Sequence, residues 1–141
     1  MIPTLWGPNF WYSIFCIATT YPKNPTREYI LNVQLFFKSF RHILPCDDCK
    51  KSYNKYSNEN DSNIDNISNF ETKDKFIKLI YIIRSKVNKK IGYDYKINFD
   101  YFKNKICYLS CYNKDTTVDI TKLREVPFIP DKFLKSVLLL V

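Results

Sequence analysis

Apolar residues recur at helical spacing in several stretches of this chain. The clearest stretch is made of Ile30, Val33, Phe37, Phe40 and Leu44. Steps of three and four place these residues on one face of an α-helix and are typical of a helix in a bundle. Thr26 has a side chain that suits a helix N-cap, and Pro45 interrupts the pattern. The sequence therefore predicts a helix between Thr26 and Pro45.

Two more helices are predicted on either side of this one. Pro8 suits the first turn of a helix, because its missing N–H needs no partner there. The apolar face that follows is made of Trp11, Ile14, Phe15 and Ala18, and Tyr21-Pro22 ends the helix. Further along, Thr72 is a predicted N-cap and Gly92 a predicted stop. The buried face between them is made of Phe76, Ile80, Ile83 and Val87.

A shorter helix is predicted to open at Cys46-Asp47-Asp48-Cys49 and to run to about Tyr56. Residues 57–68 are rich in Asn, Ser and Asp and are predicted to form a loop. After Tyr93 the pattern weakens. There the sequence allows helix or extended chain for residues 95–112, a strand or loop for 116–120, and a last helix over 131–140.

These elements predict an all-α fold, which is a four-helix bundle with a short extra helix and a C-terminal extension. Residues 1–92 form the predicted helical core, and residues 93–141 form an extension packed on it. With 141 residues, of which 45% are apolar, the chain is long enough to bury a core. Only two glycines occur, which argues against hairpin-rich sheets and against a glycine-lined phosphate loop.

The net charge is +8, with lysines spread over the second half of the chain. A solvated surface explains this best, and attraction of anions such as a phosphate-bearing cofactor is the alternative. Residues 1–22 lack the basic region and cleavage site of a signal peptide. No apolar run reaches the roughly 18 residues of a membrane span. We therefore expect a reducing compartment, where a close cysteine pair is more often catalytic or metal-binding than structural.

Cys46 and Cys49 are the candidate catalytic pair. A helix start favours the thiolate of the first cysteine, and such a pair can cycle between dithiol and disulfide. Two alternatives remain open, an incidental pair and half of a zinc site completed by Cys107 and Cys111. The 57 residues between the two pairs exceed the spacing of compact zinc modules. We predict no metal, and expect Cys16 to be a buried inert thiol.

The order of several motifs resembles that of the Erv/ALR family of FAD-linked sulfhydryl oxidases. The matching motifs are Trp6-Gly7-Pro8-Asn9-Phe10-Trp11, Tyr21-Pro22, Pro45-Cys46-Asp47-Asp48-Cys49 and Val87-Asn88. Phe15, Arg84 and Ser85 stand where the family usually has His, His and Asn. The poxvirus branch is similar to this chain at Phe15 and Arg84, and residues 117–123 are similar to the tail of that branch. The resemblance implies a viral protein of the host cytoplasm or the virion.

The resemblance also implies a function and a cofactor. Electrons would pass from a substrate dithiol, through attack at Cys46, to the Cys46–Cys49 pair, then to FAD and to oxygen. The residues expected to bind FAD are Trp6, Gly7, Trp11, Phe15, Arg84, Val87, Asn88 and Lys90, with Lys86 and Lys89 as further phosphate candidates. Cys107 and Cys111 are a candidate shuttle pair, with a structural disulfide or two buried thiols as alternatives.

The resemblance implies two partners as well. One is a thiol-containing protein substrate, for which a thioredoxin-like viral relay protein is the natural candidate. The other is a second copy of the chain, since members of the family commonly pair through their first two helices. A basic, aromatic-rich nucleic-acid-binding module and a viral structural protein without FAD are rival interpretations. The nucleic-acid module does not explain the ordered motifs, whereas a structural protein that kept the helical scaffold and lost FAD is permitted by the missing histidines. No nucleic acid is expected as a partner.

Overall fold

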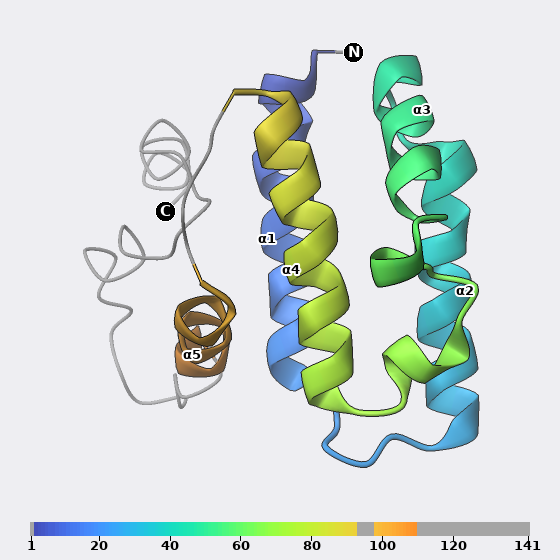
Figure 1. Cartoon of the computed structure of the whole chain (residues 1–141), viewed down its shortest axis with the longest axis vertical. Coiled ribbons are helices and arrows are strands. Elements are labelled where there is room, and N and C mark those ends of the chain that lie inside the picture. Colours follow the sequence, from blue (N-terminus) through green and yellow to red (C-terminus); the bar gives the residue numbers. More distant parts are fainter. Residues whose placement is uncertain (1, 93–97, 110–141) are drawn as a thin grey trace. The chain divides into compact units, whose positions relative to one another are not determined.

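The computed structural model describes residues 2–92 and 98–109, apart from the side chains of 105–109. These residues form helices and no strand, which confirms the all-α fold class. The α-helices are α1 (Pro3–Thr20), α2 (Arg27–Ile43), α3 (Asp47–Tyr56), α4 (Lys73–Lys90) and α5 (Phe99–Leu109) (Figure 1). Two short 3-10 helices, η1 (Asn60–Ser62) and η2 (Ile67–Phe70), lie within and after the predicted loop. In the described part of the chain, every helix is too short or too polar to cross a bilayer.

The chain divides into two compact units. The first contains α2, α3, α4 and both 3-10 helices, and the second contains α1 and α5. The predicted four-helix core over residues 1–92, with residues 93–141 packed on it, remains a prediction. The parts predicted for 116–120 and 131–140 lie outside the described residues.

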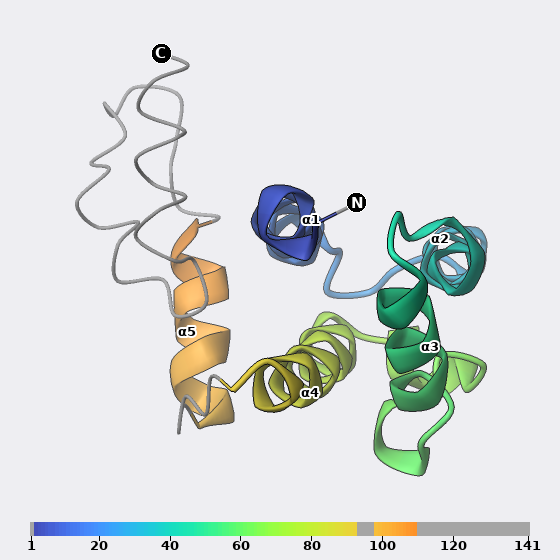
Figure 2. The ribbon, with the colours of Figure 1, turned by 90° about the horizontal axis from the view of Figure 1, so that it is seen from above.

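Phe37 lies at the centre of the aromatic core of the first unit. Its ring centroid is 5.3 Å from those of Phe40 and Phe76 and 6.1 Å from that of Phe70. Such tilted and edge-on ring pairs add to the stability that burial itself provides. The core joins α2 to η2 and α4, and Figures 1 and 2 show α3 beside α2.

The predicted apolar face of α2 is largely buried. Ile30, Phe37, Phe40 and Leu44 are all less than 9% exposed, and Val33 is half-buried. On α4, Phe76, Ile80 and Ile83 are likewise buried. The helical periodicity therefore identified the core faces of both helices correctly.

Local capping signals explain where the helices begin and end. Thr26 Oγ1 accepts a hydrogen bond from the backbone N–H of Tyr29 at 3.2 Å, and Thr72 Oγ1 accepts one from that of Lys75 at 3.2 Å. Gly92 follows α4 with a φ of +82°, a conformation that glycine adopts without strain. All three predicted helix boundaries are confirmed.

Tyr21 and Tyr53 tie helices and turns together through buried hydroxyl groups. Tyr21 donates to the carbonyl of Phe70 at 2.5 Å, and its ring stacks on Phe76 at a centroid distance of 4.3 Å. Burial, with a smaller contribution from Tyr29, raises the pKa of Tyr21 to about 12. Tyr53 of α3 donates to the carbonyl of Phe37 at 2.9 Å, and burial raises its pKa too.

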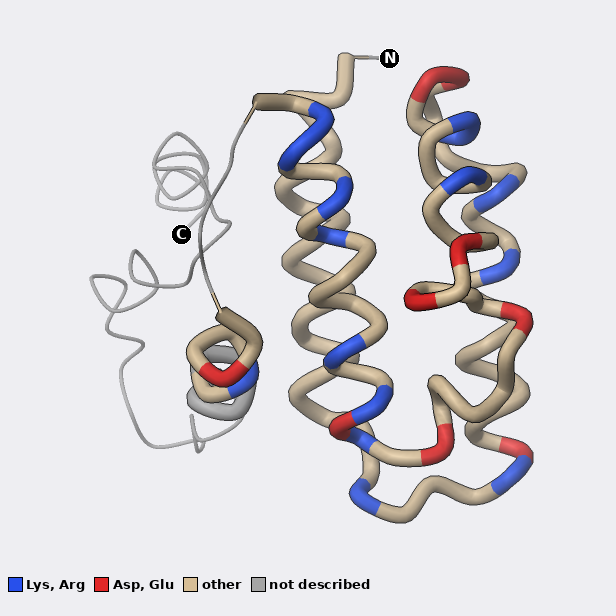
Figure 3. Tube along the Cα trace, in the orientation of Figure 1, with Lys and Arg blue, Asp and Glu red and all other residues tan. Residues whose placement is uncertain are grey.

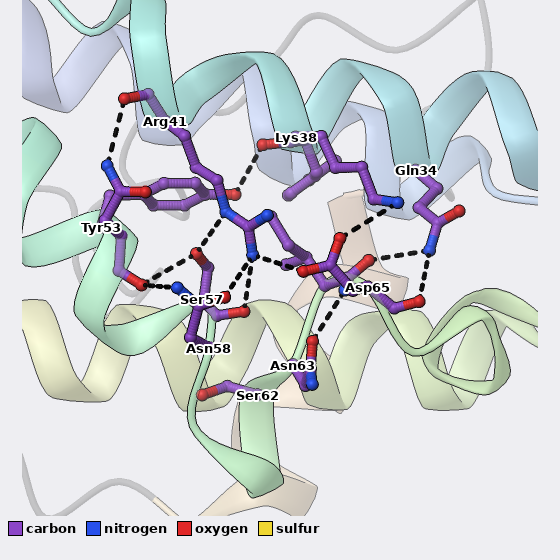
Figure 4. A network of polar contacts seen from close by, with 12 residues as sticks. Gln34, Lys38, Arg41, Tyr53, Ser57, Asn58, Ser62, Asn63 and Asp65 are labelled. Carbon is purple, nitrogen blue, oxygen red and sulfur yellow. Dashed lines mark hydrogen bonds and ion pairs between the residues drawn. The ribbon is translucent and has the colours of Figure 1, made fainter.

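Polar side chains of α2 hold the segment between α3 and η2 (Figure 4). Arg41 donates to Asn58 Oδ1 at 2.8 Å and to Asp65 Oδ2 at 2.9 Å, and its Nε donates to Ser57 Oγ at 3.1 Å. Gln34 Nε2 donates to the carbonyl of Ile64 at 2.8 Å. The predicted loop over residues 57–68 is therefore fixed on α2 by hydrogen bonds from helical side chains.

The prediction that Pro8 lies in the first turn of a helix is wrong, because α1 begins at Pro3 and Pro8 lies inside it. Both prolines fit a first turn, and Pro3 takes that position. Pro8 then costs the helix one backbone hydrogen bond, since it cannot donate to the carbonyl of Thr4. In the second unit, Phe15 and Phe102 are buried with ring centroids 5.7 Å apart. Within the stretch 95–112, residues 99–109 are helical rather than extended.

Candidate active site

The Cys46–Cys49 segment is placed by the chain's turn from α2 into α3. Leu44 is the C-cap of α2 and has an extended ψ of 134°, as expected for a residue before proline. Cys46 is the N-cap of α3, also with an extended backbone (φ −143°, ψ 122°). Its Sγ accepts a hydrogen bond from the backbone N–H of Cys49 at 3.3 Å. The first sulfur of the pair thus takes the place of a capping oxygen.

Cys46 and Cys49 are joined by a disulfide, with their Cα atoms 5.1 Å apart. Both residues are half-buried, so the bond is held by the protein and still meets solvent. An exposed disulfide at a helix start is open to thiol attack, and the N–H groups there stabilise a thiolate when it opens. This geometry favours a redox pair over an incidental one.

Charged groups surround the first turn of α3. Lys50 Nζ lies 3.1 Å from Asp47 Oδ1, and this hydrogen bond lowers the pKa of the Asp47 carboxyl. From α4, Lys90 Nζ donates to the carbonyl oxygen of Asp48 at 3.4 Å and to the hydroxyl of Ser52. Each acidic residue between the cysteines therefore contacts a lysine. Asp47 binds Lys50 through its carboxylate, and Asp48 binds Lys90 through its backbone carbonyl.

On α4, Arg84 and Asn88 are buried and Val87 is half-buried. Asn88 is 2% exposed, yet neither its Nδ2 nor its Oδ1 has a hydrogen-bond partner among the described residues. A buried amide without partners is costly, so such a group is a candidate for binding a polar ligand. This observation fits the predicted role of Asn88 in holding a cofactor.

Lys86 and Lys89, the other phosphate candidates, differ in their surroundings. Lys86 Nζ lies 2.7 Å from Glu59 Oε2 and also pairs with Asp61, so its charge is already balanced. Lys89 is exposed. Figure 3 shows basic residues gathered at the C-terminal end of α4, where these two residues and Lys90 lie.

On α1, the predicted cofactor residues form a chain of aromatic contacts. Trp6 packs edge-on against Phe10 at a centroid distance of 5.6 Å, and Trp11 lies 6.1 Å from Phe15. The indole N–H of Trp6 is buried and has no partner among the described residues. Gly7 has no heavy atom within 4 Å of where a Cβ would stand, so space is open beside it. These features fit the binding of a planar ligand with polar atoms at its edge, such as the predicted cofactor.

The remaining cysteines and the single histidine are placed as follows. Cys107 lies on α5, but its side chain and all of Cys111 lie outside the described residues, so the shuttle pair stays a prediction. Cys16 is half-buried, and burial raises the pKa of its thiol, as expected for an unreactive cysteine. His42 is exposed near the end of α2. Ser52, which meets Lys90, was not among the predicted site residues, and its type and spacing give no signal.

The fold and the site together define the class of this protein, an all-α protein with a thiol–disulfide exchange site at the N-terminus of a helix. Residues 8–107 match the family model described as the Erv1 / Alr family, which is well over half of the chain. The chain belongs to this family. The match extends past residue 92, where the predicted core ends, into α5.

Individual relatives agree with this assignment. A protein of Acanthamoeba polyphaga mimivirus named "Probable FAD-linked sulfhydryl oxidase" is 39% identical over 59 residues, which are 42% of this chain and 41% of the relative. The mitochondrial FAD-linked sulfhydryl oxidase of Saccharomyces cerevisiae is 29% identical over 85 residues, 60% of this chain and 42% of the relative. A protein of Invertebrate iridescent virus 6 is 36% identical over 47 residues, 33% and 42% of the two chains. The chain thus spans about two fifths of these relatives' length.

Proposed function

We propose that this chain is an FAD-dependent thiol oxidase that makes disulfides in protein substrates. One observation carries the proposal, namely the half-exposed Cys46–Cys49 disulfide at the N-terminus of α3 in a chain of the Erv1 / Alr family. The names of the mimivirus and yeast relatives, both FAD-linked sulfhydryl oxidases, support the same activity.

The proposed exchange begins with a substrate thiolate that attacks Sγ of Cys46. The Cys46–Cys49 bond breaks, Cys49 leaves as a thiolate, and a mixed disulfide joins the substrate to Cys46. The second substrate thiolate then attacks the substrate sulfur of this mixed disulfide and releases Cys46. Two substrate thiols have become one disulfide, and the protein has gained two electrons and two protons.

The hydrogen bond from the N–H of Cys49 supports the second step of this exchange. It points at Sγ of Cys46, the atom that carries negative charge when the mixed disulfide is resolved. A helix N-terminus stabilises that charge. Cys46 is therefore the better leaving group in the second step, which releases the oxidised substrate.

The proposed cofactor-binding residues are Trp6, Gly7, Trp11 and Phe15 of α1 with Arg84, Val87, Asn88 and Lys90 of α4. The buried polar atoms of Asn88 and Trp6 and the open space beside Gly7 fit such a group. When bound, FAD would supply the two-electron chemistry that links the cysteine pair to oxygen and yields peroxide. The protein's own part is to hold the pair half-exposed and to stabilise its thiolates.

Turnover with a small dithiol tests the activity. The purified chain should consume oxygen and form peroxide with dithiothreitol, and Cys46→Ser and Cys49→Ser should each lower the rate by about a hundredfold or more, since neither variant can form the disulfide. Cys16→Ser is the matched control, because Cys16 has no part in the exchange, and it should keep the wild-type rate. Full activity in either pair variant would refute the proposal.

We also propose that two copies of the chain pair through α2. The apolar face of α2 from Ile30 to Leu44 is mostly buried in the first unit, but Leu31, Leu35 and Phe36 of the same helix are 44%, 67% and 43% exposed. Exposed apolar residues gathered on one helix are typical of an interface. Leu35→Glu should convert a dimer to a monomer in light scattering, whereas Asn104→Glu, at an exposed polar position of α5, should not.

The two viral relatives support the proposal that this chain is a viral thiol oxidase. Its proposed location is the host cytoplasm or the virion. Its physiological substrate would be a dithiol protein, for which a thioredoxin-like relay protein is the proposed candidate. Trapping with Cys49→Ser tests this, since the Cys46 thiolate attacks the disulfide of the oxidised substrate, one substrate sulfur leaves as a thiolate, and no Cys49 thiol is present to release Cys46 from the mixed disulfide. Peptide mass spectrometry of trapped complexes from infected cells should identify the partner.

A further inference from the structure

Lys90 bridges the end of α4 and the first turn of α3. Its ammonium group donates to the hydroxyl of Ser52 and to the carbonyl oxygen of Asp48, 3.4 Å away. The hydroxyl of Ser52 in turn donates to the same carbonyl at 2.7 Å. The three groups form a closed set of hydrogen bonds between residues far apart in the sequence, which fixes the position of the lysine charge.

This charge lies beside Cys49. Ser52 follows Cys49 by three residues on α3, and residues three apart are neighbours on the surface of a helix. Asp48 precedes Cys49 directly. A cation held by Ser52 and by the carbonyl of Asp48 therefore lies within one helical turn of residue Cys49, whereas the hydrogen bond from the N–H of Cys49 is made to the sulfur of Cys46.

The other charges of this region are arranged differently. Lys50 is paired with the carboxylate of Asp47, so its charge is partly balanced. Asp48 and Lys51 of α3 and Lys89 of α4 are exposed to solvent. Among the described contacts, Lys90 is held at the first turn of α3 by a carbonyl and a hydroxyl group, and not by a carboxylate.

We propose that Lys90 raises the reduction potential of the Cys46–Cys49 pair by stabilising the Cys49 thiolate. The disulfide is neutral and the reduced pair carries thiolate charge, so a nearby cation favours the reduced form. Lys90 also stabilises Cys49 as the leaving group when a substrate thiol attacks Cys46. This role rests on the proposed thiol-exchange function and is separate from any contact that Lys90 makes with the cofactor.

Equilibration of the full chain with glutathione tests the proposal. Two molecules of reduced glutathione give two electrons and two protons to the disulfide, which yields two cysteine thiols and one glutathione disulfide. The reaction is run without oxygen and with saturating FAD for every variant. Alkylation and peptide mass spectrometry then report the redox state of Cys46 and Cys49 alone.

The variants separate a charge effect from a mechanical one. Lys90→Gln should lower the equilibrium constant for reduction about threefold to tenfold, a modest effect because the charge meets solvent. A tenfold change corresponds to about 30 mV for two electrons. Lys90→Glu should lower the constant further, and Lys90→Arg should stay within about twofold of the wild type. Lys78→Gln, at an exposed position of α4 twelve residues before Lys90, is the matched control and should change nothing.

Salt and thermal unfolding complete the test. The difference between Lys90→Gln and the wild type should shrink at about 1 M salt, because salt screens exposed charges. Equal equilibrium constants for reduction in the wild type, Lys90→Gln and Lys90→Glu, with only the unfolding midpoint changed, would overturn the proposal. Lys90 would then only stabilise the packing of α4 on α3. A pair that does not exchange with glutathione at all would instead overturn the proposed function.

Discussion

The backbone N–H of Cys49 donates a hydrogen bond to Sγ of Cys46 at 3.3 Å. Two residues of one motif thus form the cap of the helix that follows them. The cap makes the two sulfurs chemically unequal, because Sγ of Cys46 accepts a backbone N–H at the positive end of the helix. This hydrogen bond is supplied by the backbone of the motif itself.

Alkylation of the reduced pair should therefore begin at Cys46. The thiolate is the reactive form of cysteine, and a helix N-terminus favours it. Brief treatment of the reduced protein with iodoacetamide at pH 7, followed by peptide mass spectrometry, should find Cys46 labelled before Cys49. Cys16, whose thiol pKa is raised by burial, should be labelled last. Faster labelling of Cys49 would contradict the asymmetry.

The ion pair between Arg41 and Asp65 should make stability depend on pH. The hydrogen bond from Arg41 lowers the pKa of Asp65 from its ordinary 3.8, against the effect of desolvation. Since the folded state binds this proton more weakly than the unfolded state, the stabilisation is present above about pH 4 and is lost as the pH falls further. Denaturant unfolding of Asp65→Asn should show a loss of up to about 1 kcal/mol at pH 7 that shrinks steadily as the pH falls below 4.

Replacing Arg41 itself should cost more than replacing its ionic partner. Arg41→Ala also removes the hydrogen bonds to Ser57 and Asn58, so we expect a loss of about 1 to 3 kcal/mol at pH 7. Lys75→Ala is the control, because the pair of Lys75 with Glu71 is exposed on both sides and should contribute little. Equal losses for Arg41→Ala and Lys75→Ala would mean that the segment is not held by Arg41.

Asn88→Ala should weaken FAD binding without weakening the fold. The Asn88 amide makes no hydrogen bond among the described residues, so its removal costs the cofactor-free protein little and can even stabilise it. We expect the Kd for FAD to rise about tenfold, as for the loss of a buried hydrogen bond. Ser85→Ala, on the same helix, should leave FAD affinity unchanged. A destabilised fold with unchanged affinity would assign Asn88 to the core.

Local signals let the sequence predict much of this fold. The caps at Thr26 and Thr72 and the stop at Gly92 act within one turn of their own positions, so residue type and spacing suffice to predict them. The Cys46–Cys49 disulfide is similar, since its partners are only three positions apart in the sequence. Pro8 misled the prediction because a second proline, five residues earlier, satisfies the same local rule.

Contacts between distant residues could not be predicted in this way. Arg41 and Asp65 are 24 residues apart, and Lys90 and Ser52 are 38 apart. Nothing in their types or spacing distinguishes them from other charged and polar residues on helix surfaces. Similarly, the periodicity showed that α2 has an apolar face, but not that Leu31 and Leu35 would remain exposed. Tertiary packing decides which of several suitable residues meet.

We propose above all that the Cys46–Cys49 pair passes electrons to a flavin in this chain. The most direct measurement is the visible spectrum of the purified protein with FAD, without oxygen, during titration with dithiothreitol. The flavin absorption should bleach in the wild type and in Cys16→Ser and return when air is admitted, while Cys46→Ser and Cys49→Ser should keep their colour over the same time. A wild-type protein that binds no flavin, or a flavin that bleaches equally fast in both pair variants, would contradict the account.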